Sequence, residues 1–127
     1  MILKIEVAPG ELIDKITILE IKLARMSDKE KVSNVQREYA VLTRVADVVL
    51  TSPEITTLRS ELKSINEMLW QIEDDIRERD RRQDFGPDFV RLARAVYRTN
   101  DERARVKREI NRLLNSTLVE EKAYAPY

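Results

Sequence analysis

The sequence predicts an all-helical fold: an antiparallel four-helix bundle, or two helical hairpins, with coiled-coil-like packing. The 127 residues include only two glycines and four prolines, which is few for a protein built from strands and loops. Leu, Glu, Arg and Lys, which favour helices, are abundant. Apolar residues also recur at spacings of three and four along most of the chain, as on the buried face of a helix. The length predicts one domain that spans residues 1–127.

The first helix is predicted over residues 11–26, directly after Pro9 and Gly10. Its apolar positions follow one another at intervals of four and three, which makes an a/d seam: Leu12, Ile16, Leu19, Leu23 and Met26. Extending this phase would place charged residues such as Arg37 and Asp47 in the core. We therefore expect the helix to end near Met26.

A second helix is predicted over residues 30–50. Its apolar line has a shifted phase: Val35, Tyr39, Leu42, Ala46 and Val49. Ser27 and Asp28 both offer a side-chain oxygen as N-cap, and Ser27 with Glu30 matches a capping box. These signals predict a tight turn between the first two helices.

The third and fourth helices are predicted over residues 53–82 and 87–115. Ser52 is the expected N-cap of the third helix. An unbroken apolar line then runs along it: Ile55, Leu58, Leu62, Ile65, Leu69, Ile72 and Ile76. Gly86 and Pro87 end this helix and begin the next, so that the two form a hairpin.

The first two helices are shorter than the last two. At 1.5 Å per residue, the first pair would be ~25–30 Å long and the second pair ~40–45 Å. A short hairpin cannot cover a long one, and apolar seams of that length are rarely left exposed in monomers. The length difference therefore predicts a homodimer.

Both ends of the chain have the character of strands. Residues 2–7 (ILKIEV) alternate between apolar and polar side chains. Residues 117–124 (TLVEEKAY) contain β-branched and aromatic residues and follow a helix stop at Asn115. Because an isolated strand needs a partner, we expect the two segments to pair as a short two-stranded β-ribbon, within one chain or across a dimer.

The composition narrows the classes of function. The chain has no cysteine and no histidine, which excludes thiol chemistry, Ser-His triads and zinc sites built from these residues. Basic and acidic residues number 23 each, and a net charge of zero disfavours a nucleic-acid binder. No segment resembles a signal peptide, and no apolar run reaches the ~20 residues that cross a bilayer. The expectation is a soluble cytoplasmic protein with no metal, cofactor or membrane partner.

Three segments resemble a family of small bacterial proteins whose function is unknown. They are PGELIDKITILEIKL (9–23), LWQIEDDIRERDRRQDFGPDFVRLARAVYRTND (69–101) and KREIN (107–111). The resemblance spans nearly the whole chain and implies a bacterial cytoplasmic protein, in some cases encoded beside glycosyltransferases or genes for cell-surface sugars. It implies no activity, so no catalytic residue is carried over from it.

One stretch of the fourth helix interrupts its apolar seam. Between Val96 and Val106 the seam passes through Thr99 and Arg103. A second line on the third helix is polar except for one tryptophan: Lys63, Asn66, Trp70, Glu73 and Arg77. The first helix has a similar polar flank: Asp14, Thr17 and Glu20. In the predicted hairpin these three stripes would face one another near Arg103.

Two interpretations of this polar stripe stay open. In the first, which we favour, Arg103 pairs with Glu20 or Glu73 in a buried network, and the protein is a non-enzymatic dimeric scaffold or interaction module. In the second, Arg103 serves an anionic small molecule (a phosphate, a carboxylate or a sugar nucleotide) in a binding protein or small enzyme. The candidate ligand-binding residues are Asp14, Glu20, Asn66, Trp70, Glu73, Tyr97, Asn100, Arg103 and Lys107.

Two other charge patterns carry less weight. The carboxylates of Glu11 and Asp14 and of residues 73–75 (EDD) would suit Mg²⁺, but acidic residues are also common in the first turn of a helix for electrostatic reasons. The fourth helix carries a run of arginines, which we interpret as a solvated face rather than a nucleic-acid surface: Arg91, Arg94, Arg98, Arg105, Arg108 and Arg112.

Overall fold

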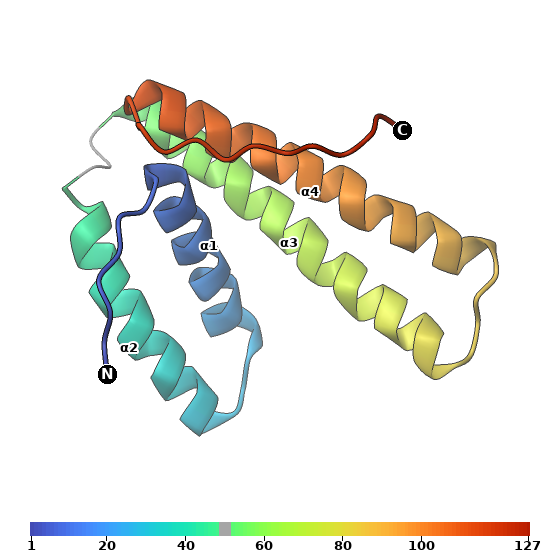
Figure 1. Ribbon diagram of the computed structural model, residues 1–127. Coiled ribbons are helices and arrows are strands. Elements are labelled where there is room, and N and C mark those ends of the chain that lie inside the picture. The colour runs from blue at the N-terminus through green and yellow to red at the C-terminus, as the bar shows by residue number, and fades with distance from the viewer. Residues whose placement is uncertain (49–51) are drawn as a thin grey trace.

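A computed structural model describes residues 1–48 and 52–127 of the chain (Figure 1). Its elements are α1 (Pro9–Arg25), α2 (Lys29–Ala46), α3 (Pro53–Arg81) and α4 (Pro87–Leu113). The all-helical class is confirmed, since the described residues contain four helices and no strand. The helix bounds agree with the predicted ones to within two residues, except at the end of α2. That helix was expected to reach residue 50, and positions 49–50 lie outside the described residues.

Side-chain caps and prolines begin the helices. Asp28 is the N-cap of α2, since its carboxylate accepts a hydrogen bond from the Lys31 N–H at 3.0 Å. The predicted capping box at Ser27 is therefore wrong: the helix begins one residue later than that box requires. Ser52 caps α3 as expected, with its hydroxyl oxygen accepting from the Ile55 N–H at 3.3 Å.

The four helices form two antiparallel hairpins of unequal length, with the shorter one placed against one end of the longer (Figure 1). α1 is the helix that joins them, since it contacts α2 on one side and both α3 and α4 on the other. Among the described residues, α2 packs on α1 and does not contact α3 or α4. The main core therefore lies between α1, α3 and α4: Ile13, Ile55, Leu62, Ile65, Val106 and Ile110.

The central position of α1 corrects its predicted seam. Of the five seam residues, Ile16 and Leu19 are buried, whereas Leu12, Leu23 and Met26 are only half-buried. A second set of α1 residues that the a/d pattern did not include is also buried: Ile13, Asp14, Thr17 and Ile21. A helix packed on two sides buries more than one stripe, so a single seam describes it incompletely.

The outer half of the α3–α4 hairpin extends beyond α1 (Figure 1). With 29 and 27 residues, α3 and α4 are about 44 and 41 Å long, against about 26 and 27 Å for α1 and α2. We call the extension, residues 69–98, the arm. Only Ile72 and Leu92 of its large apolar side chains are buried.

The predicted β-ribbon is wrong. Neither residues 2–7 nor residues 117–124 form a strand, and Figure 1 shows the first segment running along α2 and the second along α4. The two segments leave the helices close together and then diverge, because α1 and α4 meet near Lys107 and diverge from there. Within the described part of the chain, no helix combines the length and the apolar character needed to cross a membrane.

Candidate functional site

A buried polar network joins α1, α3 and α4 at the base of the arm. Both Nε and Nη2 of Arg103 donate to the Asp14 carboxylate, the first at 2.9 Å, in a two-point ion pair. Asn66 Nδ2 donates to Asp14 Oδ1 and to Thr17 Oγ1, both at 2.9 Å. The Thr17 hydroxyl in turn donates to the Asp14 carbonyl at 2.8 Å. Asp14, Thr17 and Asn66 are buried, so the Arg103 guanidinium neutralises a carboxylate that water barely reaches.

The close approach of α1 to α4 makes this network possible. The Gly10 N–H donates to Asn111 Oδ1 at 2.7 Å. A Cβ at Gly10 would lie only 2.5 Å from the Lys107 carbonyl oxygen and 2.8 Å from Asn111 Oδ1. Only glycine fits between the first turn of α1 and α4, and this contact sets Asp14 at the depth of Arg103.

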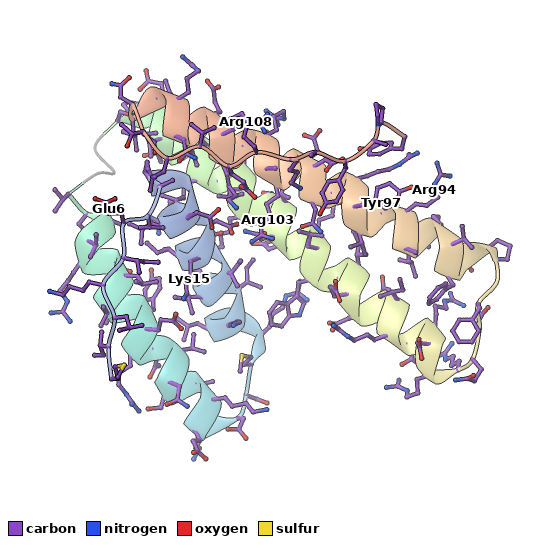
Figure 2. All side chains as sticks on the ribbon, viewed as in Figure 1. Glu6, Lys15, Arg94, Tyr97, Arg103 and Arg108 are labelled. Atoms are coloured by element: carbon purple, nitrogen blue, oxygen red, sulfur yellow. The ribbon has the colours of Figure 1, made fainter. Side chains whose placement is uncertain are left out.

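A groove of about 360 Å³ opens on the solvent side of the network. Its apolar walls are Ile18, Ile21, Leu69 and Trp70, and its polar lining is Asn66, Glu73, Asp74, Arg77, Asn100 and Arg103. The Arg103 side chain is 29% exposed, in the angle between α1 and the α3–α4 hairpin (Figure 2). Arg103 is thus paired, as the structural interpretation requires, and also faces a hollow, as the ligand interpretation requires.

The partner predicted for Arg103 was wrong. Glu20 instead lies near Arg59 and Lys63, at 3.2 and 3.7 Å, and Glu73 pairs with Arg77 one turn along α3 at 2.9 Å. Asp14 is the true partner because the contact at Gly10 brings this side of α1 to α4. Hydrogen bonding from Asp14 raises the pKa of Arg103 above its ordinary value, so the guanidinium stays charged in the groove.

Five of the nine candidate site residues line the groove, and Asp14 lies behind them in the network. The five are Asn66, Trp70, Glu73, Asn100 and Arg103. Glu20 borders a different hollow, with Arg59 and Lys63. Tyr97 faces the C-terminal segment, where Asn100 also borders a second hollow. The sequence pattern therefore identified half of the ten residues that line the groove, but not the faces of α4 on which Tyr97 and Lys107 lie.

Lys107 of α4 is buried and lies between carboxylates of two other elements. Its Nζ lies 2.5 Å from Glu11 Oε1 on α1 and 3.0 Å from Glu120 Oε2 in the C-terminal segment. Burial lowers the pKa of Lys107, but hydrogen bonds to Glu11 and Glu120 outweigh burial and leave the pKa raised. Lys107 therefore ties the C-terminal segment to the helices and does not reach the groove.

Several residues of these contacts were missed from the sequence. Asn111 gave no signal, because one asparagine in a charged helix looks like a surface residue. Glu120 was read as part of a strand. Gly10 was read only as a helix start, although a glycine beside a proline is also compatible with close packing of a helix end.

Hydrogen-bond donors in the groove come from the two arginines and from the side-chain amides of Asn66 and Asn100. Glu73 and Asp74 supply acceptors, and Trp70 supplies an aromatic ring. The two arginines both have carboxylate partners, so the groove carries little net positive charge. Within residues 1–48 and 52–127, no three carboxylates, those of Glu11, Asp14 and residues 73–75 included, gather closely enough to hold a metal ion.

Comparison with known proteins gives one match. A family model described as "Family of unknown function (DUF6165)" matches residues 3–127. No curated protein and no solved structure matches the chain.

Proposed function

Since the chain belongs to DUF6165, a family of unknown function, its role must come from its geometry, and we propose that it is a non-enzymatic homodimeric interaction module. The two copies pair through their arms. The observation that carries this proposal is the uncovered apolar face of the arm, which continues the surface that α1 covers at the base.

The arm face is apolar along its middle and charged at its edges. Ile76, Phe89 and Val96 are half-buried and line a hollow of about 480 Å³ with Glu73, Arg77, Asp80 and Arg81. Glu73 and Arg77 also line the Arg103 groove, so the two hollows are neighbours. Covering this face with a second arm would complete a four-helix arrangement and bury the apolar side chains.

The position of α1 determines the direction from which a second arm would approach. α1 occupies the base of the same face, so a partner arm enters from the tip and lies antiparallel to the first. On the arm face, Glu73 lies near the base and Arg81, beside Asp80, near the tip. Antiparallel arms would place Glu73 of one copy opposite Arg81 of the other, which favours this orientation.

The proposal is tested by light scattering coupled to size exclusion at micromolar concentration. The expected mass is twice the 14.9 kDa of one chain. Phe89→Glu places a charge in the proposed interface and should yield monomers, whereas Val45→Glu, an exposed position on α2, should leave the dimer intact. A wild-type mass of 14.9 kDa would refute the proposal.

A charge exchange tests the orientation separately. Glu73→Arg and Arg81→Glu should each weaken the dimer, because each creates like charges across the interface. The double variant should recover the affinity if the two positions face each other. Additive weakening in the double variant would contradict the antiparallel orientation while leaving dimerisation itself standing.

A second candidate function is supported by the exposed edge of Arg103. In this alternative the groove binds an anionic small molecule, with Arg103 held in place by Asp14 and a ring of the ligand against Trp70. Trp70 is the only tryptophan, so its fluorescence would report on occupancy of the groove. Inorganic phosphate or citrate should change that fluorescence and raise the melting temperature of the wild type but not of Arg103→Gln. An unchanged spectrum at millimolar concentrations would dismiss this candidate.

A further inference from the structure

The C-terminal segment encloses a second hollow, separate from the groove at Arg103. Residues 117–127 run back along α4 (Figure 1), and about 640 Å³ lies between the segment and the helix. The hollow is lined by polar and aromatic side chains of both: Tyr97, Asn100, Asp101, Lys122, Tyr124 and Tyr127. Its volume lies within the ~300–1,000 Å³ that is typical of small-molecule sites.

We call this space between residues 117–127 and α4 the strap hollow. Aromatic rings form its walls. Three of the four tyrosines in the chain line it. The rings of Tyr97 and Tyr127 are 5.2 Å apart between centroids. Tyr124 is 82% exposed, and the Lys122 ammonium lies over its ring at 5.9 Å. An exposed ring at the mouth of a hollow offers a stacking surface to a flat ligand.

The positive charge beside the hollow is not neutralised. Most arginines of α4 have acidic partners: Arg91 with Asp88, Arg105 with Glu61 and Glu102, Arg112 with Glu109. Arg94 and Arg98 form no ion pair with the described residues, and they flank Tyr97 on neighbouring turns of α4 (Figure 2 labels Arg94 and Tyr97).

The guanidinium groups of Arg94 and Arg98 both reach the tyrosines. Arg98 lies over the Tyr127 ring at 5.3 Å. Arg94 lies one turn before Tyr97 on α4, and hydrogen bonding from it lowers the pKa of the Tyr97 hydroxyl. Both arginines lie beside the hollow rather than in its lining. Lys122 adds a third cation, 3.6 Å from Asp101. Lys122 is thus paired with Asp101, whereas Arg94 and Arg98 have no acidic partner among the described residues.

We propose that the strap hollow binds a nucleoside diphosphate or triphosphate, independently of arm pairing. The base stacks on the ring of Tyr124, and the phosphates contact Arg94, Arg98 and Lys122. Arginine suits phosphate because its planar donors contact two oxygens at once. This hollow combines aromatic rings with two neighbouring arginines, Arg94 and Arg98, that have no carboxylate partner among the described residues. In the groove, by contrast, each arginine already has a carboxylate partner.

Isothermal titration of the full chain with ADP and UDP tests the proposal. At least one nucleotide should bind, and adenosine and pyrophosphate should each bind at least about tenfold more weakly because each lacks one half of the contacts. Arg94→Gln with Arg98→Gln should weaken nucleotide binding about tenfold or more. Arg91→Gln with Arg112→Gln removes the same charge from the same helix and should change affinity less than about twofold.

Tyr124→Leu separates stacking from charge. It should weaken nucleotide binding and leave pyrophosphate binding unchanged. The fluorescence of Trp70 should stay constant during titration, since Trp70 lies in the other hollow.

Four results would each overturn the proposal. They are no binding of either nucleotide at millimolar concentration, pyrophosphate binding as tightly as ADP, equal loss in the control pair of arginines, and binding that changes Trp70 fluorescence and disappears in Arg103→Gln. The last result would place the ligand in the groove instead.

Discussion

At the scale of single residues, Arg103 is the position where the sequence departs from its apolar pattern and the structure supplies the reason. A helix rarely places an arginine in line with its core residues unless a carboxylate meets it. Asp14 is that carboxylate, and Asn66 supplies a further hydrogen bond to it. A buried ion pair of this kind costs much to desolvate, so its presence specifies how α1 sits on α4 more than it adds stability.

Arg103→Ala should lower the free energy of unfolding by about 3 kcal/mol, because it leaves the buried Asp14 carboxylate without its cation. Urea denaturation followed by circular dichroism would measure the loss. Arg105→Ala serves as control on the same helix: its ion pairs are at the surface and should contribute less than about 1 kcal/mol.

Replacing both partners, Arg103→Met with Asp14→Leu, should recover much of that loss, since no unpaired charge then remains buried. A different result for Arg103→Ala would support the ligand-binding alternative. In that case Arg103→Ala would be as stable as the wild type, and stabilisation by added anions would disappear.

At the scale of elements, the contact between α1 and α4 decides which face of α1 is buried. The apolar periodicity of α1 predicted a helix and its length correctly. It did not predict that the helix would be packed on two sides. Gly10 allows the backbones to approach closely, and the Asn111 side chain satisfies its N–H. This contact at the first turn of α1 therefore determines which residues of α1 face α4.

Gly10→Ala should therefore destabilise the protein by about 1–3 kcal/mol, although alanine favours a helix, because the new methyl group would overlap the Lys107 carbonyl. The matched control is Gly86→Ala. There the nearest atom to a new Cβ is a carboxylate oxygen of Asp84 at 3.3 Å, which can move, so the loss should be below about 1 kcal/mol. Thermal unfolding of both variants compares them, and equal losses would argue against close packing at Gly10.

At the scale of the whole molecule, Lys107 joins three parts of the chain that are distant in sequence. It lies on α4, between Glu11 of α1 and Glu120 of the C-terminal segment. The segment that forms the strap hollow is thus held at one end by the ion pair between the buried Lys107 and Glu120. Loss of the positive charge would free the segment and weaken the contact between α1 and α4.

This arrangement predicts a fall in stability at high pH. Because the pKa of Lys107 is raised above 10.5 in the folded protein, its contribution is fully present below that value and is lost as the pH rises through the folded pKa. Unfolding free energies measured from neutral pH to above pH 10.5 should fall more steeply for the wild type than for Lys107→Met. The variant is the matched control because it lacks only this one titrating group. Parallel curves for the two proteins would contradict the prediction.

The sequence by itself determined the helices. Their number and type, and their bounds except at the end of α2, follow from apolar spacing, from Ser52 and Pro53 at the start of α3, and from Gly86 and Pro87 between α3 and α4. These are local properties, because capping and periodicity depend on residues only a few positions apart. The sequence also identified Arg103, Asn66 and Asn100 as unusual, since polar residues stand out against an apolar seam.

Only the tertiary structure decided which partners these residues meet. Asp14 and Arg103 are 89 positions apart, and their pairing depends on how deeply α1 packs against α4. The terminal segments show the same limit. Their composition favours strands, but a strand forms only beside another, and the helices direct the two segments along α2 and α4 instead. Contacts between distant elements depend on the packing of every element between them, which no local pattern in the sequence contains.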